Sequence, residues 1–307
     1  MKAIAVIVIF CCASASAAFG QTSPLAGRWG FNLTSASGAK QALWLGVTEK
    51  SGALEIWQQP SGGNVRQISG FKATGAHLSL PLSTAANGRP AVTWELDASG
   101  DTLTGVQKRG EESIPLAGFR EPALQRPAPK SWSQPEALFN GKDLAGWEPM
   151  SGDSHWSVQN GLLTNTAQGA NLISKRTFQD FKLHFEANCP DHANSGFYLR
   201  GRYELQLEYE PLTKNPPERR MGSIYGRLAP GTDLPRQPGE WDVFDVTLVG
   251  RTVTVVRNGV TIIDRKEIEG ITGGALDANE AAPGPFYIQG DHTGGLKFRN
   301  ITVSAAQ

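Results

Sequence analysis

The chain has 307 residues, and its 29 lysines and arginines balance its 29 aspartates and glutamates, so the formal net charge is zero. A neutral chain lacks the basic surface that attracts nucleic acid or anionic lipid, so we expect neither as a partner. The 35 glycines and 19 prolines, together with 39% hydrophobic residues, are typical of a turn-rich β-protein with a substantial core.

The first residues have the layout of a secretory signal peptide, because Lys2 precedes an apolar run from Ala3 to Cys12 that is followed by small residues. We place the signal peptide over residues 1–20 and expect a secreted or periplasmic protein. The apolar run is shorter than the roughly 20 residues that cross a bilayer, so we expect no membrane insertion. Cys189 is the one cysteine after this segment, which predicts an exported protein without an internal disulfide.

Residues 22–122 alternate short apolar-patterned runs with glycine-rich turns. Alternation with a period of two, interrupted by turns at this spacing, predicts an antiparallel β meander that is curled or barrel-like. The expected strands of this small β domain lie at residues 27–31, 42–47, 54–57, 77–80, 92–96 and 102–106.

The segment from Glu121 to Gln134 contains three prolines and no apolar period. Such a composition predicts an extended connection. We place a proline-rich linker at residues 123–135, between two domains.

Strand-like runs resume in residues 136–307. The pair Asn258-Gly259 between two of these runs is a strong hairpin signal, because both central positions of a type I′ turn need a positive φ. Many short strands without intervening helices predict a double-sheet sandwich or jelly roll. The expected strands lie at residues 156–158, 162–164, 171–174, 181–186, 196–200, 203–209, 241–249, 252–257, 261–263, 286–289 and 296–303.

The second half contains a series of distinctive sequence blocks. They are LFNGKDLAGW at residues 138–147, NSGFYLRG at 194–201, YELQL at 203–207, GSIYG at 222–226, GEW at 239–241, RNG at 257–259, IQGDH at 288–292 and FRNI at 298–301. These blocks resemble, in order, those of the 3-keto-disaccharide hydrolase family. The resemblance covers roughly residues 135–305 and implies a concanavalin A-like jelly roll acting on carbohydrates. One difference is Gly290, which this chain inserts where the family continues directly from glutamine to aspartate.

The run Tyr203 to Tyr209 predicts a row of polar side chains on one face of a strand. Residues at alternate positions share a face, so Glu204, Gln206 and Glu208 lie together, opposite the aromatic and leucine side chains. The same rule aligns Tyr198 with Arg200. We expect these rows to line the concave sheet, where a sugar binds in such folds.

The resemblance implies a substrate already oxidised at C3 of a glucose unit. A ketone there acidifies the C2 proton, so that a base can start β-elimination of the glycosidic oxygen, after which water adds to the enone. We predict Glu204 as the base and Asp291 or His292 as the acid, because elimination needs both groups. Arg200 is expected to clamp the enolate or a sugar hydroxyl. The predicted substrate-binding residues are Arg200, Gln206, Glu208, Tyr198, Tyr225 and Gln289.

Two alternatives remain open. Glu204 and Glu208 lie roughly 13 Å apart at Cα in an extended strand, and their side chains can lean toward the separation of about 5 Å that a retaining endoglucanase needs. Gln206 stands where those enzymes carry an aspartate, which disfavours that chemistry. The other alternative is a carbohydrate-binding module without catalysis.

No cofactor is implied by the sequence, because it contains neither a histidine-rich zinc motif nor paired cysteines. The sequence also contains two acid-imidazole pairs, Asp191-His192 and Asp291-His292. A divalent metal ion bound by both pairs therefore remains an open alternative. We expect an oligosaccharide or glycoside as the binding partner.

Overall fold

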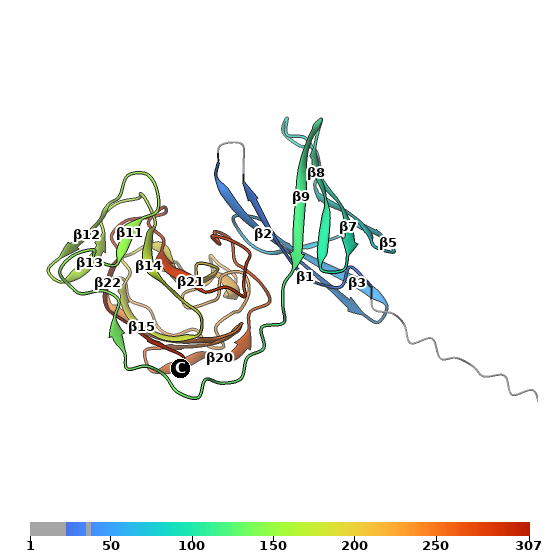
Figure 1. Ribbon diagram of the computed structural model, residues 1–307. Coiled ribbons are helices and arrows are strands. Elements are labelled where there is room, and N and C mark those ends of the chain that lie inside the picture. The colour runs from blue at the N-terminus through green and yellow to red at the C-terminus, as the bar shows by residue number, and fades with distance from the viewer. Residues whose placement is uncertain (1–22, 35–37) are drawn as a thin grey trace, which may run out of the picture.

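The computed structural model describes residues 23–34 and 38–307, so the predicted signal peptide lies outside the described residues. Its regular structure is β-strand apart from one short 3-10 turn, Pro217–Arg219, which confirms the all-β fold class. The strands form three antiparallel sheets, one in the first half and two in the second (Figure 1). Within the described residues, no helix is long and apolar enough to cross a membrane.

The first sheet has nine strands in the order β4-β3-β2-β1-β9-β8-β7-β6-β5. Neighbours in the sheet are mostly neighbours in the chain, as predicted for a meander. The strands are β1 (Gly27–Thr34), β2 (Lys40–Lys50), β3 (Ala53–Gln59), β4 (Arg66–Ile68), β5 (Lys72–Thr74), β6 (His77–Ser83), β7 (Val92–Ser99), β8 (Thr102–Arg109) and β9 (Glu112–Arg120).

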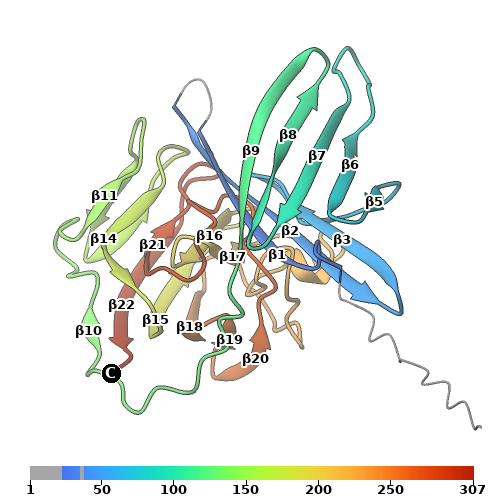
Figure 2. The ribbon, with the colours of Figure 1, turned by 45° about the vertical axis from the view of Figure 1, so that its right-hand side comes forward.

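The pairing of β1 with β9 joins the two halves of this sheet, with Trp29 opposite Arg120 and Phe31 opposite Gly118. The sheet is curled (Figure 2). Apolar side chains of one face pack together, and the rings of Phe31 and Trp94 lie 5.2 Å apart. The end strands β4 and β5 are not paired with each other. The first half is therefore an open, curled sheet and not a closed barrel.

The predicted linker residues 123–135 run along the second half of the chain. Arg126 forms an ion pair with Asp180 at 3.1 Å, and Trp132 forms an isolated β-bridge with Ala306. Arg251 also donates a hydrogen bond to Ala123 O at 3.0 Å. The segment is therefore extended as expected, but it is attached to the second half along its length.

The second half contains two curled sheets packed face to face (Figure 1). One is built on β12-β13-β22-β15-β18-β19-β20, with β10 also paired to β22, and the other has the order β11-β14-β21-β16-β17. The strands are β10 (Glu136–Ala137), β11 (Trp147–Pro149), β12 (Trp156–Gln159), β13 (Leu162–Asn165), β14 (Leu172–Phe178), β15 (Phe181–Asn188), β16 (Asn194–Leu199), β17 (Tyr203–Glu208), β18 (Trp241–Val249), β19 (Thr252–Arg257), β20 (Val260–Glu267), β21 (Gly284–Ile288) and β22 (Lys297–Ala305).

The predicted hairpin at Asn258-Gly259 joins β19 to β20. Asn258 and Gly259 have φ values of 50° and 77°, and Arg257 pairs with Val260 across the turn. A type I′ turn requires positive φ at both central positions, so the local sequence determines this connection.

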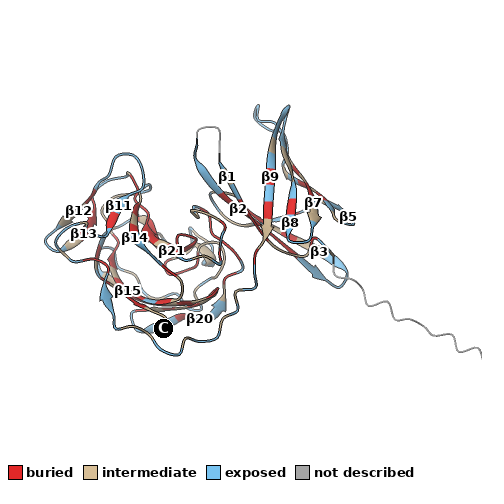
Figure 3. Cartoon of the chain, in the orientation of Figure 1, coloured by how far each residue is buried: buried red, intermediate tan, exposed pale blue. Residues whose placement is uncertain are grey.

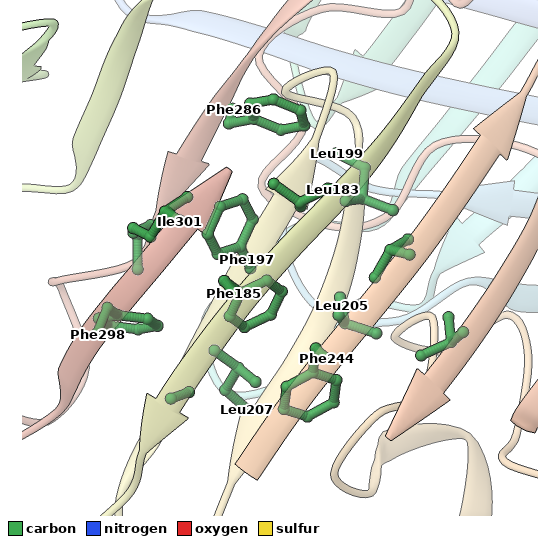
Figure 4. Close-up of a cluster of buried hydrophobic side chains, with 14 of the residues drawn as sticks. Leu183, Phe185, Phe197, Leu199, Leu205, Leu207, Phe244, Phe286, Phe298 and Ile301 are labelled. Carbon is green, nitrogen blue, oxygen red and sulfur yellow. The ribbon is translucent and has the colours of Figure 1, made fainter. Parts of the chain in front are cut away.

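Aromatic rings fill the space between the two sheets of the second half. Phe185 on β15 stacks on Phe197 of β16 at 4.5 Å and on Phe244 of β18 at 5.0 Å (Figure 4). Buried residues accordingly lie on β15 and β21, which belong to opposite sheets (Figure 3). Cys189, the free cysteine of the described residues, is buried in the same core, and burial raises the pKa of its thiol to about 12.

Phe185→Ala is expected to lower the free energy of unfolding by about 3–5 kcal/mol, because it removes the ring that connects the two sheets and leaves a cavity. Urea denaturation monitored by tryptophan fluorescence measures this change. Val260→Ala is the control, because Val260 is 41% exposed in the hairpin and its truncation should cost less than about 0.5 kcal/mol. A loss for Phe185→Ala no larger than that of the control would contradict the assignment of this core.

Candidate active site

The polar row predicted on β17 lies on the face of the five-stranded sheet that is turned away from the aromatic core. Leu205 and Leu207 belong to the core cluster, whereas Glu204 and Gln206 alternate with them and face the other side. The two polar side chains are only 5% and 4% exposed. The row is therefore a buried polar surface, which unlike an ordinary solvated strand face needs partners for its polar groups.

Cross-strand pairing places two tyrosines beside Glu204. Tyr198 of β16 pairs with Glu204 of β17 on one side and with Tyr287 of β21 on the other. The two tyrosine rings stack, with centroids 3.9 Å apart and planes at 14°. Adjacent strands thus bring the three side chains into one row across the sheet.

Burial is the main influence on Glu204, and it raises the pKa of this carboxyl group to about 8. Its Oε2 accepts a hydrogen bond from Tyr198 Oη at 2.8 Å, which partly offsets the effect of burial. Gly196 makes room for the carboxylate, because a Cβ at that position would lie 2.6 Å from Glu204 Oε1. A glutamate of this kind can be neutral or charged near neutral pH, as a general base requires.

The Tyr198 hydroxyl has more acceptors than protons. Its Oη lies 2.8 Å from Glu204 Oε2 and 2.5 Å from Gly273 O, and it also accepts from Gln289 Nε2 at 3.3 Å. One hydroxyl proton can satisfy one of the two acceptors. When Glu204 is protonated it can donate to Tyr198, which then donates to Gly273 O. When Glu204 is charged, it competes for the Tyr198 proton.

Asp291 and His292 form an ion pair at the rim of this surface. Asp291 Oδ1 lies 2.7 Å from His292 Nδ1, and the two side chains are about half exposed. The hydrogen bond raises the pKa of His292 and lowers the pKa of Asp291. The charge of His292 also lowers the pKa of Glu204, so the loop after Gly290 does bring the pair within electrostatic range of the glutamate.

The predicted substrate-binding residues Gln206, Tyr225 and Gln289 surround Glu204. The Gln206 amide, oriented with its nitrogen toward the glutamate, donates to Glu204 Oε1 at 3.0 Å. The Tyr225 backbone N–H donates to Glu204 O at 3.0 Å, and its ring is half-buried. Gln289 has a buried Oε1 without a partner among the described residues, which leaves an acceptor for a ligand hydroxyl.

Glu208 lies at the far end of the polar row and is occupied by protein groups. It forms an ion pair with Arg236, and its Oε1 also accepts from the Met221 N–H at 3.0 Å. Only 1% of Glu208 is exposed. Sequence reasoning missed Arg236, which lies in the loop before β18 and has no strand pattern that would place it.

The predicted alignment of Arg200 with Tyr198 was wrong. Arg200 follows the last residue of β16 and has a φ of 53°, so the strand alternation ends before it. Its guanidinium donates to Gly250 O at 2.6 Å and lies over the ring of Tyr203, which faces the core. Arg200 is fully buried on the opposite side of the sheet from Glu204 and does not reach the site.

Sequence reasoning also missed the segment Thr272–Gly274, which closes one side of the site. Thr272 Oγ1 accepts from Glu204 N at 3.0 Å, and Gly274 O accepts from Tyr287 Oη at 2.6 Å. The segment lies far along the chain from β17 and has no strand pattern. Its adjacent glycines are the one signal of a close backbone approach.

The two acid-imidazole pairs have different neighbours. His192 contacts Asp191 and Glu210, whereas His292 contacts Asp291. Among residues 23–34 and 38–307, no group of three or more histidine, cysteine, aspartate or glutamate side chains has an arrangement that could hold a metal ion. The structure thus provides no set of ligands for the divalent ion that the sequence left open.

Residues 134–304 match the sequence pattern of the 3-keto-alpha-glucoside-1,2-lyase-like domain family. The protein belongs to this family. The match covers more than half of the chain and includes the whole polar row, whereas β1 to β9 lie outside it. Membership identifies a carbohydrate-active enzyme and confirms the family expected from the sequence blocks.

Three solved structures that this chain resembles come from Parabacteroides distasonis and are described as candidate glycosyl hydrolases. They are 29%, 21% and 22% identical to the chain, with TM-scores of 0.48, 0.46 and 0.44. The matches cover 58%, 56% and 56% of this chain and 92%, 94% and 98% of the others. A comparison with curated proteins found no match.

The free energy of unfolding of the Glu204→Gln variant is expected to rise relative to that of the unsubstituted protein as the pH rises from about 5 to about 8. The pKa of Glu204 is about 8 in the folded protein, above the ordinary value of roughly 4.3 in an unfolded chain. The folded protein therefore binds more protons in this window, and its free energy of unfolding falls as the pH rises; glutamine does not titrate and avoids this loss. Thermal unfolding at both pH values measures the difference.

Glu186→Gln provides a control of opposite sign. Burial disfavours the charge of Glu186, but hydrogen bonds from Asn300 and Arg299 outweigh it and lower its pKa. Its contribution to stability is present throughout that pH range and is lost only as the pH falls through the lowered pKa. This variant should be destabilised equally at both pH values. If the difference in stability between Glu204→Gln and the unsubstituted protein were also the same at both pH values, the raised pKa of Glu204 would be refuted.

Proposed function

We propose that the protein cleaves 3-keto-glycosides by removing the C2 proton, eliminating the glycosidic oxygen and hydrating the resulting enone. The observation that carries this proposal is Glu204, a buried carboxyl group whose pKa is about 8. Proton abstraction next to a ketone is general base catalysis, which works best when the pKa of the base lies near the working pH. Membership of the 3-keto-alpha-glucoside-1,2-lyase-like family supports the same substrate class.

The first step transfers the C2 proton to a Glu204 oxygen, and the electrons of the C2–H bond form the enolate of the C3 ketone. The enolate then reforms the ketone, a double bond forms between C1 and C2, and the bond from C1 to the glycosidic oxygen breaks. His292 is the acid that protonates this oxygen, because Asp291 raises the pKa of His292 and keeps the imidazole cationic to higher pH.

Hydration reverses the proton transfer. Water adds its hydroxyl to C1 of the enone and gives its proton to the neutral His292, while the proton held by Glu204 returns to C2. Both groups thereby regain their starting protonation states. We assign the binding of sugar hydroxyls to the Gln289 Oε1, which has no partner in the part of the chain that the structure describes, and to the hydroxyl of Tyr225. Arg200 has no part in this scheme, because its guanidinium lies on the core side of the sheet.

Retaining hydrolysis by Glu204 and Glu208 is the second candidate, since both carboxylates lie on the same face of β17. That mechanism needs one free carboxylate as nucleophile and one acid about 5 Å away. Glu208 Oε1 is instead bound to Arg236 and to the Met221 N–H, and its Oε2 is buried, so neither oxygen is exposed as a nucleophile. A binding module without catalysis is disfavoured because the polar row contains two buried carboxyl groups, Glu204 and Glu208, rather than exposed aromatic rings.

The purified protein should release free sugar from a 3-keto-disaccharide and leave its unoxidised parent intact, as followed by chromatography. Glu204→Gln should lower kcat at least about a hundredfold, which is the scale of general base catalysis. Glu148→Gln is the matched control, because Glu148 lies on β11 of the same sheet but is exposed and should be silent. Cleavage of the parent that requires both Glu204 and Glu208 would establish the retaining mechanism, and binding without turnover would establish a binding module.

The value of kcat/KM should rise with pH, reach half of its maximum near pH 8 and level off only above that pH, because Glu204 must lose its proton, with a pKa of about 8, before it can act as the base. His292→Asn should move this limb to higher pH, since the imidazolium charge lowers the pKa of Glu204. A stopped-flow pH series on both proteins measures the limb. A limb in the ordinary glutamate range, near pH 4–5, would exclude Glu204 as the titrating base.

A further inference from the structure

The segment Gly273–Gly274 lies between the active site and the first half of the chain. On the side of the first half, Gly274 N donates to Ser61 O at 3.0 Å. A Cβ at Gly273 would lie 2.3 Å from Gly63 O. The backbone of one half therefore rests directly on the backbone of the other, with no space for a side chain.

The same two glycines contact the tyrosines of the site on their other side. Tyr198 Oη donates to Gly273 O at 2.5 Å and Tyr287 Oη to Gly274 O at 2.6 Å. A Cβ at Gly274, whose φ is 83°, would lie 2.6 Å from Tyr198 Oη. A shift of this segment would thus change the hydrogen bonds of both tyrosines.

The loop of the first half that touches this segment is held by Gln59, the last residue of β3. Gln59 is 1% exposed, and its Nε2 donates to Pro60 O at 3.0 Å and to Gly63 O at 2.9 Å. These two bonds fix the turn that presents Ser61 and Gly63 to the glycine segment.

Further contacts keep the two halves together beside the loop. Asn32 Oδ1 accepts from Ala278 N at 2.7 Å, and Trp44 packs with Ile271 in a hydrophobic cluster shared by both halves. The first half therefore contacts the residues on both sides of Gly273–Gly274. Its sheet can act as a rigid support for this side of the active site.

We propose that the first half of the chain is a positioning element of the active site, and that Gln59 orders the loop Pro60–Asn64 so that it holds Gly273 O against the Tyr198 hydroxyl. This inference rests on the proposed function, in which Glu204 is the base. Gln59 is a positioning residue, because it touches neither the substrate nor Glu204.

The direction of the effect follows from the single proton of Tyr198. With Gly273 O in place, this proton is shared between the carbonyl and Glu204; if the carbonyl moves away, Tyr198 donates to Glu204 alone. A hydrogen bond to the charged form lowers the pKa of a carboxyl group and weakens it as a base. The other ionisable groups that face Glu204 are unchanged by a substitution at Gln59, and they are Tyr225, Tyr287, Asp291 and His292.

The test compares Gln59→Met with Gln58→Met in the full chain. Gln58 is the matched control, because it is equally buried and adjacent, but its Oε1 accepts from Arg66 Nε at 3.1 Å and does not hold the loop. Gln59→Met should lower kcat/KM on a 3-keto-disaccharide about tenfold and move the ascending limb of the pH profile about one unit lower, whereas Gln58→Met should change neither.

Hydrogen exchange of the Gly274 amide gives a readout that does not depend on activity. This amide donates to Ser61 O, so Gln59→Met should speed its exchange while the core strand β15 stays protected. Gly273→Ala should likewise speed exchange of the Gly274 amide and leave β15 protected, because its Cβ would collide with Gly63 O.

The outcomes separate this proposal from the proposed function. If the unsubstituted protein does not cleave the keto sugar, the proposed function fails, and the exchange experiment still tests whether the loop orders the glycine segment. If that protein is active but Gln59→Met and Gln58→Met have the same pH profile, or if Gly274 exchange is unchanged, the positioning role of the first half is wrong.

Discussion

The buried carboxyl group of Glu204 is the constraint on which the site depends. A carboxylate removed from water is unstable unless hydrogen bonds compensate it, and here the compensation is incomplete, so the pKa of the group rises to about 8. Antiparallel pairing places Tyr198 and Tyr287 beside it in one row. The aromatic core on the opposite face keeps these strands in register, because a shift by one residue would turn the polar row into the core.

The two halves of the chain meet at the segment whose carbonyls accept hydrogen bonds from Tyr198 and Tyr287. The family pattern begins at residue 134, yet the carbonyls that accept from the two tyrosines belong to a segment packed against Ser61 and Gly63. The first half and the family domain are distinct in the sequence, but hydrogen bonds join them in the structure. A domain outside the family thus contacts the segment that carries these carbonyls, beside the bond that β17 itself makes to Thr272.

Strand periodicity predicted the parts of the structure that depend on local rules. It placed the polar row of β17 correctly and identified the hairpin at Asn258-Gly259. It missed β9, whose Pro115 argues against a strand. Pro115 pairs with β8 alone, because β1 contacts β9 only from Gly118 onward, and prolines within sheets are found at such edge positions. Arg200 was misplaced because a φ of 53° ended the alternation, and contacts through distant loops, such as Gly273 with Tyr198, leave no periodic trace.

The buried thiol of Cys189 has a consequence for the reactivity of the fold toward oxidants. It is the free cysteine of the described residues, and its thiol has a pKa of about 12 and is shielded by the core of the second half. A thiol of this kind is neither a nucleophile nor a partner for exchange with oxidants. Within residues 23–34 and 38–307, the fold therefore offers oxidants no exposed thiol, and its stability rests on packing rather than on a disulfide.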